Sequence, residues 1–154
     1  MSVFELLKQG DIEGAATYFE QHPEAINAKD EKGFTPLIFA TYMNNFDLAN
    51  LLLKKGADIN AQDMAGNTAL MGVSFKGTLE MVKLLIEHGA DISMKNFNGA
   101  TALHFAAGYG QLDIVKLLLQ KGADPKAIDG QGQTALQHAK AKGQQAIVPL
   151  LANA

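Results

Sequence analysis

Apolar residues along this chain fall into short helical stretches that are separated by glycine-containing turns. Residues 96–128 show the pattern most clearly: a turn at residues 96–99 leads into an apolar, Ala-rich run at residues 105–107. After two glycines, a second apolar run covers residues 112–119 and ends before another glycine. This spacing predicts two short helices joined by a glycine break. A unit of this size cannot bury its own apolar face, so it needs similar units on both sides.

The same unit recurs with a period of 33 residues. The step connects the turn glycines, the threonines after them, and the leucines of the first and second helices: Gly33, Gly66, Gly99 and Gly132; Thr35, Thr68, Thr101 and Thr134; Leu37, Leu70, Leu103 and Leu136; Leu52, Leu85, Leu118 and Leu151. No insertion interrupts this frame from Asp30 onward. We therefore expect one domain, 1–154, with full repeats at 30–62, 63–95 and 96–128. Capping repeats are expected at 1–29 and 129–154, because terminal repeats must present one face to water.

This frame resembles the ankyrin-repeat family, which has a 33-residue period and the signature Thr-Pro-Leu-His-x-Ala. The resemblance implies a mainly α solenoid of stacked helix-turn-helix units with protruding short β-hairpins or turns. It also implies that His104, which follows Thr101-Ala102-Leu103, bonds within its own turn and helix start and to the neighbouring repeat. Ile38, Met71 and Gln137 occupy its position elsewhere, so those junctions are expected to depend more on packing.

Two places depart from the regular repeat. Near the N-terminus, residues 3–9 and 12–21 predict helices, and His22-Pro23 ends the second one without the usual glycine stop. In the third repeat, Gly72 lies inside the expected first helix, where glycine costs about 1 kcal/mol relative to alanine. Either a neighbouring backbone approaches closely there, or the helix is locally weak, and we favour a weak helix.

Composition narrows the class of partner. The chain has 154 residues, 47% of them hydrophobic, and a net charge of -3. All 13 basic residues are lysines. Since bidentate recognition of phosphate or guanine mainly uses arginine, nucleic acid is a poor candidate. The absence of cysteine excludes disulfides, thiolate catalysis and zinc–thiolate sites. No signal or membrane-spanning pattern is visible, so we expect no membrane partner and a cytoplasmic location. We also expect a monomer.

No catalytic or metal-binding constellation stands out. The segment 130–135 imitates a dinucleotide fingerprint, but its glycines belong to the repeat frame. The histidines fall at four different repeat positions, and a metal site would need three or four convergent ligands. Aspartates recur at the period in the turns, as expected for residues that cap turns rather than for a catalytic pair. We therefore expect no enzyme activity, no catalytic residue, no cofactor and no metal.

The variable positions of the frame carry the functional hypothesis. In the ankyrin-repeat family, the hairpin tips and the exposed side of the first helices line a concave groove that binds partners. By this resemblance the groove carries a set of mostly apolar and aromatic residues: Phe34, Tyr42, Met43, Met64, Phe75, Lys76, Phe97 and Tyr109. Aromatic residues and methionine are enriched in interfaces.

Three hypotheses about the function of these positions stay open. We favour a non-enzymatic protein–protein interaction module that binds a partner protein in the groove. The alternatives are an enzyme or accessory protein with a small-molecule site in the groove, and a purely structural spacer. A separate possibility is that some of these rings lie against neighbouring repeats and belong partly to the core.

Overall fold

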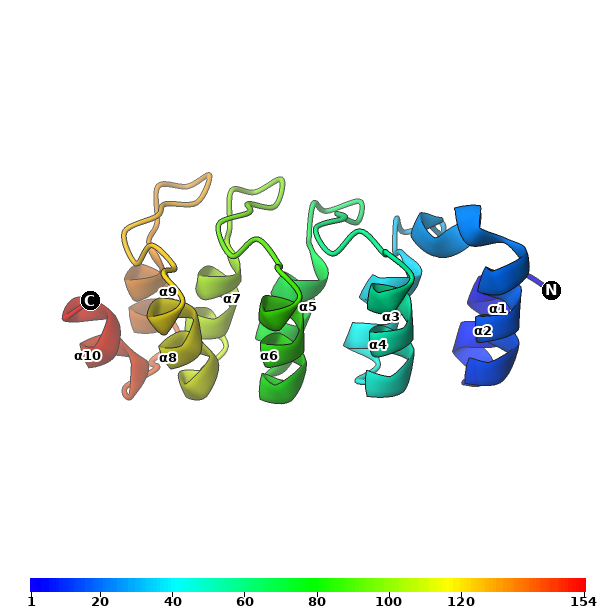
Figure 1. Ribbon diagram of the computed structural model, residues 1–154. Coiled ribbons are helices and arrows are strands. Elements are labelled where there is room, and N and C mark those ends of the chain that lie inside the picture. The colour runs from blue at the N-terminus through cyan, green and yellow to red at the C-terminus, as the bar shows by residue number, and fades with distance from the viewer.

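The helices of this protein form pairs that follow one another in a row, with the connecting hairpins projecting to one side (Figure 1). The computed structural model describes residues 1–154. The first helices of the pairs are α1 (Val3–Gln9), α3 (Pro36–Tyr42), α5 (Ala69–Lys76), α7 (Ala102–Gly108) and α9 (Ala135–Ala141). The second helices are α2 (Ile12–Gln21), α4 (Phe46–Lys54), α6 (Leu79–Glu87), α8 (Leu112–Gln120) and α10 (Ile147–Ala152), and a 3-10 helix, η1, covers Pro23–Asn27.

The hairpins between the pairs are turns without β-strands, so only the turn half of the predicted "hairpin or turn" is correct. In each hairpin, the side chain of an aspartate or asparagine accepts backbone N–H bonds from the same hairpin. Each hairpin after the first also donates one backbone N–H bond to the hairpin before it. In the first of these pairs, Met64 N–H donates to Lys32 O at 3.1 Å. A single backbone bond for each neighbouring pair of hairpins is too little to make a strand ladder, which needs successive backbone bonds along both chains.

The recurring threonines start the first helices. In each repeat the threonine side chain accepts a hydrogen bond from the backbone N–H three residues later, for example Thr35 Oγ1 from Ile38 N at 3.2 Å. Such a cap satisfies a helix N–H that has no partner within the helix. Pro36 follows Thr35 at a position where its missing N–H has no bond to lose.

The recurring leucines form the core between repeats. None of the six from the three complete repeats is more than 2% exposed: Leu37, Leu52, Leu70, Leu85, Leu103 and Leu118. The first helices pack against one another in order, α3 with α5, α5 with α7 and α7 with α9. The two helices of each pair also pack against each other, so the hydrophobic periodicity marks one continuous core that runs through all the repeats.

Two structural reasons, a left-handed backbone and a close neighbouring backbone, favour glycine in the hairpins. Gly66 has φ +80°, and a Cβ added there would lie 2.6 Å from the backbone nitrogen of Phe97 in the next hairpin. Gly132 has a similar φ of +74°, but a Cβ there would have nothing within 4 Å. The left-handed conformation alone favours glycine at both positions, and the close approach of a neighbouring backbone adds a second reason at Gly66.

The third repeat contains several unfavourable local features. A Cβ added at Gly72 would meet only Tyr42 Cδ2, at 3.7 Å, so the alternative of a close neighbouring backbone is wrong. The hydroxyls of Ser74 and Thr78 are buried without a hydrogen-bond partner, whereas Asn45 caps its helix at the position equivalent to Thr78. These features support the weak-helix interpretation of Gly72.

We predict that Gly66→Ala destabilises the protein more than Gly132→Ala does. Both variants place alanine in the left-handed region, which costs about 1–2 kcal/mol. Only Gly66→Ala also presses a methyl group into the Phe97 backbone. Urea unfolding of the two variants and wild type gives the comparison. Equal losses in the free energy of unfolding would show that the neighbouring hairpin shifts to make room for the added methyl group.

We also predict that Gly72→Ala raises the free energy of unfolding by up to about 1 kcal/mol, because alanine favours the helix and the methyl group finds only van der Waals contact. Thermal and urea unfolding measure the change. A decrease in stability would contradict the weak-helix interpretation.

Candidate protein-interaction groove

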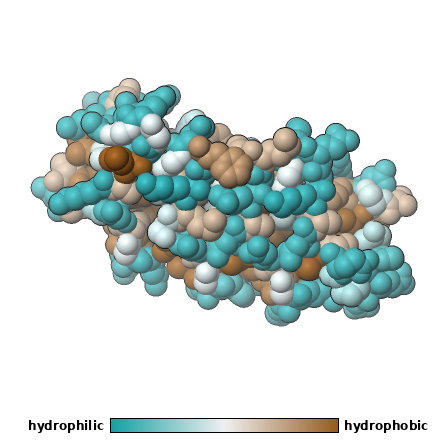
Figure 2. All heavy atoms as spheres, turned by 90° about the horizontal axis from the view of Figure 1, so that it is seen from above, coloured by the Kyte–Doolittle hydropathy of each residue, from teal (hydrophilic) through white to brown (hydrophobic).

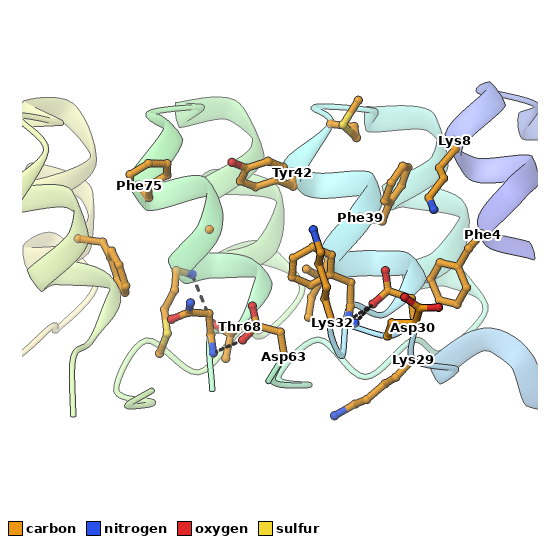
Figure 3. A pocket seen from close by; sticks show the side chains of 18 of the residues that line it. Phe4, Lys8, Lys29, Asp30, Lys32, Phe39, Tyr42, Asp63, Thr68 and Phe75 are labelled. Atoms are coloured by element: carbon orange, nitrogen blue, oxygen red, sulfur yellow. Dashed lines mark hydrogen bonds between the residues drawn. The ribbon is translucent and has the colours of Figure 1, made fainter. Parts of the chain in front are cut away.

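A groove of about 910 Å³ runs along the first helices α1, α3, α5 and α7 and the inner side of the first hairpins. Of the eight residues predicted for this surface, five line it: Phe34, Tyr42, Met43, Phe75 and Tyr109. Figure 3 shows Tyr42 and Phe75 on successive helices along the groove, with Phe39, Phe4 and Lys8 at its N-terminal end.

The three first-helix aromatics are partly open to solvent. Tyr42 is 44%, Phe75 37% and Tyr109 52% exposed. The rings of Phe75 and Tyr109 meet edge to face with centroids 4.5 Å apart. Tyr42 is instead covered by Lys76, whose Nζ lies 4.3 Å from the ring centroid and donates to Tyr42 O at 2.7 Å. The structure therefore arranges these side chains as an aromatic pair and a cation–π pair.

Phe34 and the two residues at the hairpin tips have different surroundings. Phe34 is half-buried and packs against the core, which agrees with the possibility that some rings belong partly to the core. Met64 and Phe97 are each 71% exposed on hairpin tips, and neither lines the groove. Phe97 lies over Gly66 of the preceding hairpin. Seen from the hairpin side, the surface is largely hydrophilic, and apolar residues form separate groups (Figure 2).

Several groove residues were missed by the sequence analysis, among them Phe4, Phe39 and Phe105. A signal was available for two of them. Phe39, Gly72 and Phe105 occupy one frame position in three successive repeats, and both phenylalanines are half-buried and line the groove. Comparing this position across repeats would have placed both rings beside Gly72.

Most polar groups along the groove are already bound to the chain itself. Asp30 Oδ1 accepts from Lys32 N and Phe34 N, both at 2.9 Å, and Asp63 makes the equivalent bonds in the next hairpin. The prediction that the recurring aspartates brace the turns is thus confirmed. Lys29 Nζ donates to Gln62 O at 2.8 Å. These groups stabilise the hairpins, whereas the side chains of Lys8, Glu31 and Lys32 line the groove without such a bond.

His104 has the role that the family resemblance implied. Thr101 N–H donates to His104 Nδ1 at 3.1 Å, which places the proton on Nε2, and Nε2 then donates to Gln133 O at 2.9 Å. The first bond closes the start of α7, and the second reaches the next hairpin. Burial lowers the pKa of His104 below its ordinary value of 6.5, so the neutral ring is favoured.

The structure brings His104, Asp129 and His138 together, with their ligand-type atoms within 4.8 Å of one another. His138 Nε2 lies 2.7 Å from Asp129 Oδ2. The backbone N–H of Gln133 and then His138 lower the pKa of Asp129 to about 2. A metal ion at this cluster would have to break one of the two His104 bonds, because both ring nitrogens are already in use. The cluster is therefore best explained as a hydrogen-bonded junction.

Comparison with known proteins identifies the family. An ankyrin-repeat model of three copies matches residues 62–129, and an ankyrin-repeat model of many copies matches residues 20–71. Together with the stacked helix pairs and their hairpins, these matches show that the chain belongs to the ankyrin-repeat family. Ankyrin-repeat proteins generally mediate protein–protein interaction and are typically not enzymes.

Individual relatives share part of the repeat region. The chain is 33% identical to the human DNA-binding protein RFXANK over 58 residues, which cover 38% of this chain and 22% of the relative. It is 41% identical to human ankyrin repeat family A protein 2 over 58 residues, 38% of this chain and 18% of that protein. A putative ankyrin repeat protein of Rickettsia bellii is 40% identical over 34% of either chain. The matches thus span about a third or less of these relatives.

No helix in the structure reaches the length and apolarity required to cross a bilayer.

We predict that the stability of the wild-type protein falls more steeply between pH 7 and pH 5 than that of His104→Gln. A pKa lowered by folding means that neutral His104 stabilises the protein above its unfolded pKa of about 6.5. This contribution is lost as the pH falls through the folded pKa. Gln137 holds the equivalent position one repeat later and accepts from Thr134 N at 2.8 Å, so glutamine preserves the helix start without titrating. Urea unfolding at both pH values provides the test, and parallel losses in the two proteins would contradict the prediction.

Proposed function

We propose that this chain is a non-enzymatic interaction module, a single ankyrin-repeat domain over residues 1–154, that binds a partner protein in its groove. Tyr42, Phe75 and Tyr109 form the centre of the proposed contact. The other residues of the proposed surface are Phe34, Met43, Met64, Lys76 and Phe97.

The observation that carries this proposal is the exposure of three aromatic side chains on successive repeats along one groove. The buried leucines and threonine caps account for the fold without them. Large aromatics that folding does not require are typical of interaction surfaces. Burying them against a partner removes apolar area from water at about 25 cal/mol per Å².

The groove is also preformed, which favours binding. Its walls belong to helices whose leucines are buried between repeats, and its hairpins are braced by aspartate and lysine bonds. A surface that does not reorganise loses little conformational entropy when a partner docks. Rigid complementarity is therefore the mechanism we propose.

A small-molecule site is the second candidate, because 910 Å³ lies within the range of ligand pockets. Such sites normally offer converging polar groups that orient a ligand. Here the aspartates of the groove accept backbone N–H bonds, and Lys29 donates to a backbone carbonyl. The groove offers aromatic rings more than free polar groups, which favours a protein partner.

We predict that replacing Tyr42, Phe75 and Tyr109 together by alanine leaves the protein folded and removes most partner binding. Rings exposed to this extent contribute about 1 kcal/mol or less each to folding. A few central aromatics usually dominate an interface. The measurements are a melting curve and affinity capture from lysate, with both proteins immobilised at equal density.

Ile128→Ala provides the matched control, since Ile128 is 51% exposed and does not line the groove. It should capture the same proteins as wild type. If the three rings belonged to the core, each substitution by alanine would instead lower the free energy of unfolding by about 3–5 kcal/mol. Unfolding of the triple variant would therefore show that these rings belong to the core. A folded triple variant that retains its captured proteins would exclude the groove as the binding site.

A further inference from the structure

His104 differs from the residues at the same position of the other full repeats because its side chain can take up a proton. Ile38 and Met71 hold this position at the two earlier junctions. His104 holds it at the junction between α7 and residues 129–154, which we call the terminal repeat. Among these three positions, only the one beside the terminal repeat can change its charge with pH.

The bonds of His104 fit the neutral ring. Nδ1 accepts the Thr101 N–H at 3.1 Å and lies 2.9 Å from the Thr101 hydroxyl, while Nε2 donates to Gln133 O at 2.9 Å. A proton on Nδ1 would turn this acceptor into a donor that faces the Thr101 N–H. Both residues are buried, so water does not replace the lost bond, and an unpaired buried donor destabilises the folded form.

The surroundings of His104 also oppose a second proton on its ring. Burial is the largest cause of the lowered pKa of His104, and the nearby His138 and Lys95 lower this pKa further. The bond to Gln133 O and the charge of Asp129 act in the opposite direction. The helices that pack against α7 are α5, α8 and α9, and their other charged side chains are all exposed: Lys76, Asp113, Lys116 and Lys140.

The ring of His104 is covered by the terminal repeat. The rings of His104 and His138 meet edge to face with centroids 5.5 Å apart. Gln133, whose carbonyl oxygen accepts from His104, donates its own N–H to Asp129 Oδ1 at 3.0 Å. Asp129 Oδ2 in turn lies 2.7 Å from His138 Nε2 on α9. A charged His104 therefore regains water when this connected hairpin and helix move away from α7.

The terminal repeat is held on one side only. Gln137 and Lys140 are exposed at frame positions that the inner repeats bury, and α10 starts without a side-chain cap. The stability of a stack is roughly the sum of terms for its repeats and for the junctions between them. A repeat with a single junction therefore opens at a lower free energy than an inner repeat.

We propose that the junction between α7 and the terminal repeat is a pH-sensitive contact: uptake of a proton by His104 releases residues 129–154 from the stack, while the earlier repeats stay folded. Neutral His104 stabilises the junction above its unfolded pKa of 6.5, and this contribution is lost as the pH falls through the lowered folded pKa. The inference goes beyond the proposed function and is independent of it, because every residue that lines the groove precedes Gly110.

The test is amide hydrogen exchange of the full chain at pH 7, 6 and 5, measured by mass spectrometry and corrected for the intrinsic exchange rate at each pH. We expect the opening constant of α9 and α10 to rise by up to about tenfold for each pH unit, since the opened repeat binds one proton more. At pH 5, helices α3 to α6 should stay protected after α9 and α10 have exchanged. Simultaneous loss of protection in all repeats would refute the release of one repeat, and a constant opening of α9 and α10 would refute the pH-sensitive contact.

His104→Gln tests the assignment to this ring, because Gln137 shows that glutamine closes the same helix start by accepting from Thr134 N. We expect the opening constant of α9 and α10 in this variant to be nearly independent of pH. The matched control is His88→Gln, which removes a histidine at the end of α6 whose Nδ1 bonds Leu84 O at 2.9 Å. It should keep the wild-type pH dependence. Retained pH dependence in His104→Gln, or its loss in His88→Gln, would contradict the assignment.

Asp129→Asn provides a second test that keeps His104 in place. Asn96 holds the equivalent position one repeat earlier and accepts the equivalent two backbone N–H bonds, so the hairpin should still form. The substitution removes the negative charge that favours protonated His104 and that pairs with His138. We therefore expect the opening constant of α9 and α10 to rise more between pH 7 and pH 5 than in the wild type. A smaller rise would overturn the proposal.

Discussion

The structure depends on one constraint, which is that every helix pair buries its apolar side only against the pairs beside it. The exact 33-residue register allows the same bond to recur from repeat to repeat. Lys29 Nζ donates to Gln62 O, Gln62 Nε2 to Lys95 O, and Lys95 Nζ to Ile128 O, at 2.8, 3.1 and 3.0 Å. A one-residue insertion would shift these donors and the buried leucines together, so the absence of insertions after Asp30 follows from the stacking.

Within this frame, a side chain of one repeat lies over a glycine of the repeat before it and bonds a carbonyl group at the end of the first helix there. Gly110, with φ +75°, lies beneath Gln144, whose Oε1 would be 2.7 Å from an added Cβ, and Gln144 Nε2 donates to Gly108 O. Asn44 holds the same frame position two repeats before Gly110. It is a non-glycine residue with a positive φ, at 56°. Thr78 holds the frame position of Gln144 in that part of the chain, and Lys76 instead donates the bond to the carbonyl oxygen of Tyr42. Different side chains thus bond the last carbonyl groups of the first helices in different repeats.

Gly72 links stability to the proposed function. As a helix residue it weakens α5, and the unpaired hydroxyls of Ser74 and Thr78 in the same repeat add to this weakness. As a groove residue it holds the frame position of Phe39 and Phe105 without a ring. Residues kept for binding and not for folding commonly reduce local stability. The repeat with these unfavourable local features thus also carries Phe75, one of the three aromatics of the proposed contact.

The sequence alone determined the helices, the hairpin positions and the core. Helices α1 and α2 have the predicted bounds, and the threonine caps and aspartate turns form as expected, because these features depend on bonds within four residues and on an unbroken period. The tertiary structure decided which side chains share the groove. It brought in Phe4, Phe39 and Phe105, left Met64 and Phe97 on the hairpin tips, and joined Asp129 to His104 and His138. These outcomes depend on how far each repeat rotates against the next and on which rotamer each side chain adopts, and a one-dimensional period contains neither quantity.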